Sequence, residues 1–90
     1  MKTVRYSTQF KKDIKRYTNK PDYLIALRQI VVLLENGQPI PIKHRPHRLL
    51  GEYKGCMECH VLSDFLLIWM DEENDVVWLE RIGTHSELFK

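Results

Sequence analysis

The sequence predicts an α+β domain in which two N-terminal helices pack on a mainly antiparallel four-stranded sheet, followed by a short C-terminal helix. Two observations lead to this fold class. Apolar residues recur at helical spacing through the first third of the chain, and three strand-like apolar segments separated by polar turns fill the last third. With 90 residues, the chain is expected to form one domain spanning 1–90.

The chain is predicted to begin with a short strand at 2–6 and a first helix. Ser7 can cap that helix, because its hydroxyl can accept a hydrogen bond from a free backbone N–H of the first turn. Phe10, Ile14 and Tyr17 then recur on one helical face. The opposite face is basic and carries Lys11, Lys12, Lys15 and Arg16.

A second helix is expected from Pro21 to a left-handed cap at Gly37. Its apolar stripe consists of Leu24, Leu27, Ile30, Val31 and Leu34. The segment 38–51 that follows contains three prolines, two histidines and no periodicity. A loop of this length in so small a domain is usually functional or disordered.

Three strands are predicted in the last third of the chain, at 52–61, 65–70 and 76–82. The residues Thr84 to Glu87 have the pattern of a capping box, in which side chains satisfy the free N–H groups at a helix start. This capping box predicts the short C-terminal helix and places His85 in its first turn.

The pairing of these strands predicts which side chains share a face. If the first hairpin turns at 62–63, His60 lies opposite Phe65, and the next hairpin then brings Phe65 opposite Arg81. These three side chains would form one row, with Lys54 on the same face. The other face and the helix stripes should form the core, for which we predict Phe10, Ile14, Leu27, Val31, Leu34, Met57, Ile68 and Trp78.

Charge is distributed unevenly along the chain. Residues 1–54 carry 12 Lys or Arg against 4 Asp or Glu, whereas residues 55–90 carry 2 against 8. A basic surface of this kind suits nucleic acid, although a solvated helix face would explain most of the lysines equally well. No apolar run approaches a membrane span, and the N-terminus lacks an apolar signal core, so we expect a cytoplasmic protein.

Cys56 and Cys59 precede His60 in a C-x-x-C-H pattern, which occurs at haem attachment, zinc and redox sites. Haem attachment would need export, and a zinc site would need a second pair of ligands. We therefore expect no metal and no cofactor. Residues three apart on a strand point to opposite faces, so two separately buried thiols are the preferred interpretation.

The titratable residues of the last third suit proton transfer at a phosphate. Ribonuclease chemistry needs a base for the 2′-hydroxyl, an acid for the departing 5′-oxygen and positive charge for the phosphorane. His60 and His85 are candidates for the first two roles, and which is the base stays open. Arg81 offers a two-pronged contact to phosphate oxygens, and Phe65 offers a stacking platform. His44 has no supporting context and is interpreted as a loop residue.

Several motifs resemble those of the YafQ branch of the RelE/ParE toxins. They are His47-Arg48-Leu49-Leu50-Gly51, Tyr53-Lys54-Gly55, Glu58-Cys59-His60-Val61, Asp64-Phe65-Leu66-Leu67-Ile68 and the run from Glu80 to Phe89. The resemblance covers the order of elements throughout and about 45 C-terminal residues in motif. Phe65 stands where the family often has Trp.

This resemblance implies a RelE-like toxin of a type II toxin–antitoxin pair that cleaves messenger RNA on the ribosome without metal or cofactor. It implies an active site of His47, His60, Asp64, Arg81, His85 and Phe89. Asp64 would orient or polarise an imidazole, or act as the base itself. The residues expected to contact RNA are Lys54, Phe65, Lys11, Lys12, Lys15 and Arg16. The implied partners are a cognate antitoxin, the ribosome and mRNA, with operator DNA bound only through the antitoxin complex and no membrane.

Two alternatives belong to other classes. The first is a non-catalytic nucleic-acid-binding module or transcriptional co-repressor that uses the basic helices and tolerates loss of His85. The second is a relative from the gyrase-poisoning branch of the same superfamily, which would not need this set of histidines.

Overall fold

The computed structural model describes residues 1–89 and contains a five-stranded sheet in the order β1-β5-β4-β3-β2. β1 runs parallel to β5, and the other neighbours are antiparallel. The strands are β1 (Thr3–Tyr6), β2 (His47–Arg48), β3 (Met57–Leu62), β4 (Phe65–Glu72) and β5 (Val76–Gly83). The helices are α1 (Thr8–Ile14), α2 (Pro21–Glu35) and α3 (His85–Leu88), with 3₁₀ turns at η1 (Lys15–Tyr17), η2 (Ile42–His44) and η3 (Gly51–Tyr53).

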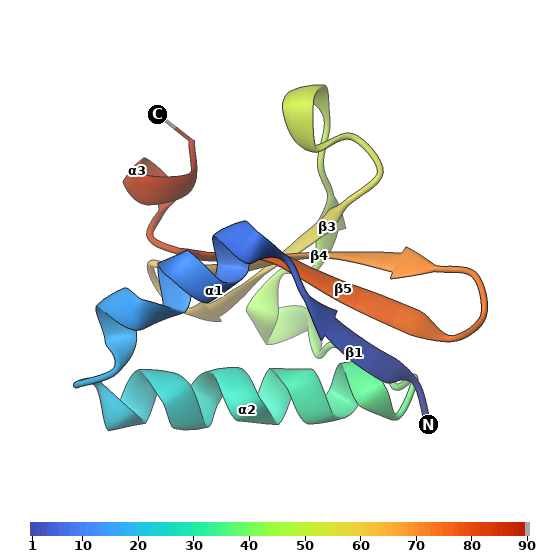
Figure 1. The fold of residues 1–90 in the computed structure, drawn as a ribbon, viewed down its shortest axis with the longest axis horizontal. Coiled ribbons are helices and arrows are strands. Elements are labelled where there is room, and N and C mark those ends of the chain that lie inside the picture. Colours follow the sequence, from blue (N-terminus) through green and yellow to red (C-terminus); the bar gives the residue numbers. More distant parts are fainter. Residues whose placement is uncertain (90) are drawn as a thin grey trace.

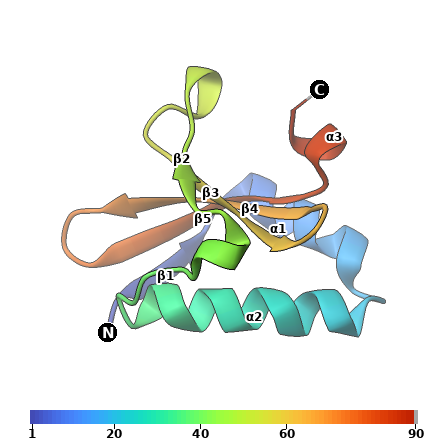
Figure 2. The ribbon, with the colours of Figure 1, turned by 180° about the vertical axis from the view of Figure 1, so that it is seen from behind.

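The sheet separates two apolar layers. α2 covers one face, and α3 and the loop around η3 rise from the other (Figure 1). Seen from behind, β2 leads up into that loop, while η2 lies on the α2 side (Figure 2). The larger core lies between the sheet and the helices α1 and α2. A smaller cluster lies on the opposite face of the sheet and consists of Cys56, Leu66, Ile68 and Leu88. None of the helices within residues 1–89 has the length and apolarity needed to cross a bilayer.

The helix boundaries confirm the sequence predictions. Ser7 Oγ accepts a hydrogen bond from Phe10 N at 2.9 Å and starts α1. Pro21 occupies the first turn of α2, and Gly37 follows its end with a φ of 65°, a left-handed conformation that glycine adopts at little cost. The capping box between Thr84 and Glu87 is present at α3.

Beyond the end of β1, the side chains of Ser7 and α1 bind the backbone of β5 along its free edge. Ser7 Oγ donates to the backbone oxygen of Glu80 at 2.7 Å, and Asp13 Oδ2 accepts from Ile82 N at 3.2 Å. These side chains satisfy backbone groups that a neighbouring strand would otherwise bind. The carboxylate of Asp13 is therefore fully buried, at 0% exposure, against the end of β5.

The prediction of four strands was wrong, because residues 47–48 form a fifth strand, β2, paired with β3. The strand predicted at 52–61 starts only at Met57. Gly51 and Gly55 adopt φ values of 74° and 94°, so the chain turns through η3 before it becomes extended. Lys54 consequently lies in a loop rather than on a strand.

The predicted register was wrong in both hairpins. It was wrong by one residue between β3 and β4, and by three between β4 and β5 at Arg81, which lies opposite Ile68 instead of Phe65. The hairpin turns at Ser63-Asp64, so Leu62 pairs with Phe65 and, across a bulge, His60 pairs with Leu66. A one-residue slip moves every side chain to the other face. Phe65 therefore points into the larger core, where its ring centroid lies 4.6 Å from that of Tyr17.

His60 and Arg81 nevertheless share a face, as predicted. His60 lies opposite Leu66 and Arg81 opposite Ile68, and Leu66 and Ile68 are two residues apart on β4. Of the predicted core, Phe10, Leu27, Val31 and Leu34 are buried in the larger cluster, and Ile14 and Met57 pack against it. Ile68 is buried on the other face, and the half-buried Trp78 belongs to neither cluster.

Candidate active site

The turn between β3 and β4 brings two histidines to one end of the sheet. His60 Nδ1 lies 3.2 Å from the Ser63 backbone oxygen. The next residue, Asp64, accepts a hydrogen bond at Oδ1 from the backbone N of His85 at 2.9 Å. One two-residue turn thus holds His60 on β3 and positions the start of α3, which carries the exposed His85. The His85 ring packs on Phe89 with centroids 5.0 Å apart.

Three imidazoles share one hydrogen-bonding pattern. The Nδ1 atoms of His44, His47 and His60 lie 2.7, 2.7 and 3.2 Å from the backbone oxygens of His60, Arg45 and Ser63. A carbonyl oxygen can only accept, so each Nδ1 must carry a hydrogen to make these bonds. In the neutral rings the basic nitrogen is therefore Nε2. This pattern leaves the Nε2 of His60 as the atom that can take or give a proton.

His47 is also paired with a buried carboxylate. Its Nε2 lies 3.1 Å from Glu58 Oε1, and the Glu58 side chain is 6% exposed. Because His47 Nδ1 already donates to a carbonyl, the second contact requires one more proton, shared between Nε2 and the carboxylate. The other carboxylate oxygen, Oε2, is buried without a hydrogen-bond partner among residues 1–89. The position of His47 is thus coupled to an otherwise unsatisfied charge.

Arg81 is held by two residues that the sequence analysis did not select. Asp13 accepts from Nε at 2.7 Å and from Nη2 at 3.2 Å, and Tyr53 Oη accepts from Nη1 at 2.9 Å. Hydrogen bonds to Asp13 raise the pKa of the guanidinium against the opposing effect of burial. Burial alone would raise the pKa of Asp13, but the bonds from Arg81, Gln9 and Ile82 N hold it below its usual value.

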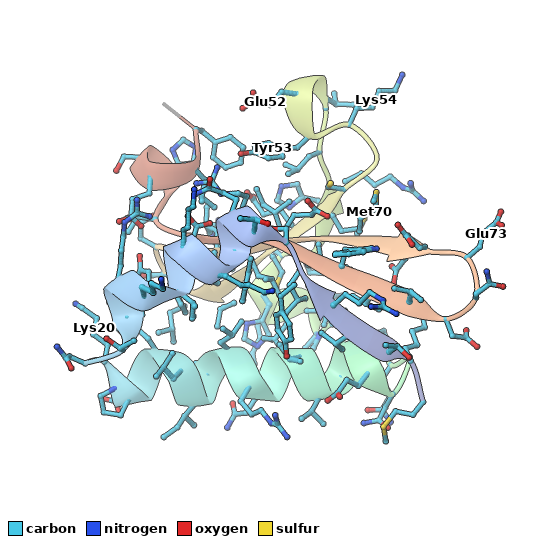
Figure 3. All side chains as sticks on the ribbon, in the orientation of Figure 1. Lys20, Glu52, Tyr53, Lys54, Met70 and Glu73 are labelled. Carbon is cyan, nitrogen blue, oxygen red and sulfur yellow. The ribbon has the colours of Figure 1, made fainter. Side chains whose placement is uncertain are left out.

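The interpretation of Phe65 as a stacking platform is wrong, because its side chain has no exposed surface. Lys54 projects from the loop after η3 into solvent, while Tyr53 points toward α3 (Figure 3). Lys11, Lys12, Lys15 and Arg16 are all exposed, but Arg16 lies 3.5 Å from Asp13 and 3.8 Å from Glu87. In the part of the chain that the structure describes, no three His, Cys, Asp or Glu side chains are grouped to hold a metal ion.

Asp13 and Glu58 could have been suspected from the sequence. Asp13 interrupts a basic run at a position that shares the helical face of Phe10 and Tyr17, and a lone carboxylate on an apolar stripe needs a partner. Glu58 is two residues from His60 and so shares its face of the strand. Nothing in the sequence indicated that Tyr53 would meet Arg81 or that His44 would reach β3.

Comparisons with known proteins identify the class of protein to which this fold and site belong. Residues 2–90 match the family model described as "Bacterial toxin of type II toxin-antitoxin system, YafQ". The mRNA interferase toxin YafQ of Escherichia coli K12 is 35% identical over 92 residues, covering 96% of this chain and 94% of the relative.

Solved structures give the same result. The crystal structure of YafQ from E. coli strain BL21(DE3) superposes with a TM-score of 0.88 at 31% identity and full coverage of both chains. YafQ in the crystal structure of the E. coli DinJ-YafQ complex gives a TM-score of 0.85 at 32% identity, again over both chains entirely. The chain belongs to the YafQ family of type II toxin–antitoxin toxins.

Proposed function

We propose that this toxin is an endoribonuclease that cleaves messenger RNA on the ribosome by metal-independent acid–base chemistry in the cytoplasm, and that a cognate antitoxin inhibits it. The name mRNA interferase of its E. coli relative supports the endoribonuclease activity. The observation that carries the proposal is the Ser63-Asp64 turn, which fixes His60 Nδ1 and the backbone of His85 at one end of the sheet.

In this mechanism His60 and His85 share the roles of base and acid. His60 can exchange a proton only at Nε2, because its Nδ1–H is bound to Ser63. Asp64 acts by positioning His85 through its backbone rather than by polarising a ring. Each proton transfer of this type contributes roughly 10²–10⁴-fold to the rate. His47 and Phe89 position the nucleotide, and Lys54 supports the phosphate contact.

Arg81 supplies the positive charge for the phosphorane. A guanidinium has five N–H donors, and the three bonds to Asp13 and Tyr53 occupy three of them. The remaining N–H groups of Nη1 and Nη2 can bind phosphate oxygens without release of Asp13. The Asp13 carboxylate then fixes the orientation of the Arg81 guanidinium, so that the guanidinium need not move when negative charge develops on the phosphorane.

The antitoxin is expected to cover the groove between α1 and α2. This groove has a volume of about 440 Å³, and its floor is apolar, with Phe10, Leu27 and Val31. Lys11, Lys15 and Arg28 form its basic rim. An amphipathic antitoxin segment with apolar residues flanked by Asp or Glu fits this combination. The crystal structure of the E. coli DinJ-YafQ complex supports an antitoxin partner for this chain as well, and operator DNA would be bound only through the complex. Lys12 and Arg16 remain available for ribosomal RNA.

The decisive experiment is single-turnover cleavage of messenger RNA on programmed ribosomes across pH, with and without 1,10-phenanthroline, which binds transition metals and leaves the Mg²⁺ of the ribosome in place. We expect cleavage at full rate in phenanthroline and its loss in His85→Ala. Complete loss of activity in phenanthroline would refute the metal-independent mechanism. The proposal as a whole would be refuted if the pure, folded protein did not cleave messenger RNA on programmed ribosomes and if its expression without an antitoxin did not arrest growth.

A further inference from the structure

The segment 43–48 is the most basic part of the sequence. Five of its six residues are Lys, Arg or His. The catalytic assignment uses only His47, and His44 was interpreted as a loop residue. The structure instead ties His44 to the catalytic strand, because its Nδ1 lies 2.7 Å from the backbone oxygen of His60. This bond occupies the edge of β3 just beyond the end of β2.

The chain between the two histidines is held in an unfavourable conformation. Arg45 adopts a φ of 50°, in the left-handed region that residues with a side chain rarely occupy. Its backbone oxygen accepts the bond from His47 Nδ1 at 2.7 Å, and its N–H bonds to the oxygen of Ile42 at 2.8 Å. Two imidazoles thus pin the loop to β3 on either side of Arg45. Backbone strain of this kind often accompanies ligand sites.

A cleft of about 470 Å³ lies beside this loop and is bounded on its far side by the β3–β4 turn. Its polar lining consists of Lys43, His44, Arg45, His60 and Ser63, and no carboxylate lines it. Lys43 and Arg45 are exposed, and within residues 1–89 neither forms an ion pair. Two uncompensated cations beside one concavity favour an anionic ligand.

We propose that this cleft binds the phosphodiester and ribose next to the scissile bond of the messenger RNA, with Lys43 and Arg45 on the phosphate and His44 on the sugar. This inference rests on the proposed function and extends it to a second subsite. Because His44 Nδ1–H is bound to His60, the neutral ring presents the lone pair of Nε2 to the cleft. A ribose 2′-hydroxyl can donate to that lone pair and a deoxyribose cannot. An occupied subsite would also steady the backbone of His60.

The first test measures cleavage on programmed ribosomes over a range of toxin concentrations. Lys43→Gln combined with Arg45→Asn removes both cations, and Asn tolerates the left-handed conformation. We expect the half-saturating concentration to rise about tenfold while the maximal rate is unchanged. Lys2→Gln with Arg5→Gln is the control of equal charge, because it removes two cations from β1 and the residue before it, at the opposite edge of the sheet. It also removes the exposed ion pair of Lys2 with Asp71, which is 3.5 Å long. Thermal unfolding verifies the fold of each variant.

The second test separates the messenger from the ribosome as the source of the phosphate. Binding to ribosomes without messenger RNA should be equal for wild type and the Lys43/Arg45 double variant. If the double variant bound empty ribosomes as much more weakly than wild type as it binds programmed ribosomes, Lys43 and Arg45 would contact ribosomal RNA. That result would overturn the proposal.

The third test concerns His44. Asn places an amide where the ring has Nδ1, so His44→Asn can keep the bond to His60 while it removes Nε2, whereas His44→Gln retains a polar atom near Nε2. A messenger with one 2′-deoxyribose next to the cleaved bond should be bound a few-fold more weakly by wild type, and as well as the all-ribose messenger by His44→Asn. If the single 2′-deoxyribose weakened binding to His44→Asn as much as it weakens binding to wild type, the assignment of His44 to the sugar would be overturned.

Failure of this inference is distinguishable from failure of the proposed function. If wild type cleaves, and the Lys43/Arg45 double variant has the same half-saturating concentration as wild type, only the proposed subsite is wrong. If wild type does not cleave ribosome-bound messenger RNA, the proposed function fails and the subsite fails with it.

Discussion

Asp13 on α1 and Arg81 on β5 form a two-pronged ion pair across 68 residues of sequence, with Nε–Oδ2 and Nη2–Oδ1 distances of 2.7 and 3.2 Å. The carboxylate is fully buried and the Arg81 side chain is 17% exposed. The proposed phosphate contact of the active site is therefore also part of the attachment of α1 to the sheet. Substitutions of Arg81 consequently affect stability as well as catalysis.

We predict that Arg81→Ala destabilises the protein by about 3 kcal/mol, because it leaves the Asp13 carboxylate buried without its main partner. Removal of Asp13 as well, in Asp13→Asn/Arg81→Ala, should restore part of that loss. Urea unfolding of wild type, the two single variants and the double variant gives the coupling free energy. The catalytic defect should persist in the double variant, since its cation is still missing. Additive losses of stability would show that the ion pair does not couple the two residues.

Acid should weaken the fold through the same carboxylate. The pKa of Asp13 and that of Glu87, which accepts a hydrogen bond from Tyr17 at 2.7 Å, both lie below their usual values despite burial. A lowered pKa in the folded state adds stability above the unfolded value of about 4, and this stability is lost as pH falls through the folded value. As pH falls from 6 to 3, the free energy of unfolding measured in urea should decrease less steeply in Asp13→Asn than in wild type. Asp22→Asn, which removes an exposed carboxylate, is the control, and equal steepness in wild type and Asp13→Asn would contradict the prediction.

The sequence predicted the helices well because their signals are local. The hydroxyl of Ser7, the proline at 21 and the glycine at 37 each act within a few residues, and all three perform the expected role. His60 and Arg81 share a face as predicted only because two errors of register cancel. Along β4, the partner of His60 is shifted by one residue and that of Arg81 by three, and each odd shift changes the face.

The register of the sheet depends on contacts that are not local. Phe65 enters the core because Tyr17 and Tyr23 line its site, with Phe65–Tyr23 ring centroids 4.9 Å apart, and the hairpin turn moves by one residue to allow this. The partners of Arg81 were equally hidden, since Asp13 and Tyr53 reach it from elements that only the tertiary fold brings together.

The two cysteines should be unreactive in the folded protein. Cys59 is fully buried in the larger core, and burial raises the pKa of its thiol to about 12, with a further contribution from Glu58. Burial also raises the pKa of Cys56, which lies in the cluster on the opposite face, as predicted. Because the thiolate is the nucleophile, we expect little modification by iodoacetamide at pH 8 until guanidinium unfolds the chain. Rapid labelling of Cys59 in the native protein would contradict the structure.

His85→Ala should lower the single-turnover cleavage rate by roughly 10²–10⁴-fold, the range for loss of a general acid or base. Its fold should be unchanged, because the exposed ring contacts Phe89 and the bond to Asp64 comes from the backbone. His85→Gln should fail to a similar extent, since an amide does not titrate. Asp64→Asn is the companion variant and should be less severe, because an amide oxygen can still accept from His85 N. Full activity in His85→Ala would exclude its proton-transfer role.

The last prediction concerns His47 and Glu58, whose contact requires one shared proton. His47→Ala removes the partner of Glu58 Oε1, and Oε2 has none among residues 1–89, so the buried carboxylate loses its contact with an imidazole. We expect the free energy of unfolding to fall by about 1–3 kcal/mol at pH 7. Glu58→Gln removes the charge but keeps the shape, so His47→Ala should cost less in that background. The measurement is a double-mutant cycle from urea unfolding, with the cleavage rate of each variant recorded in parallel. If His47 contributes only by positioning, its removal should raise the half-saturating concentration of toxin more than it lowers the maximal rate. A cycle without coupling would mean that the carboxylate finds another partner when His47 is removed.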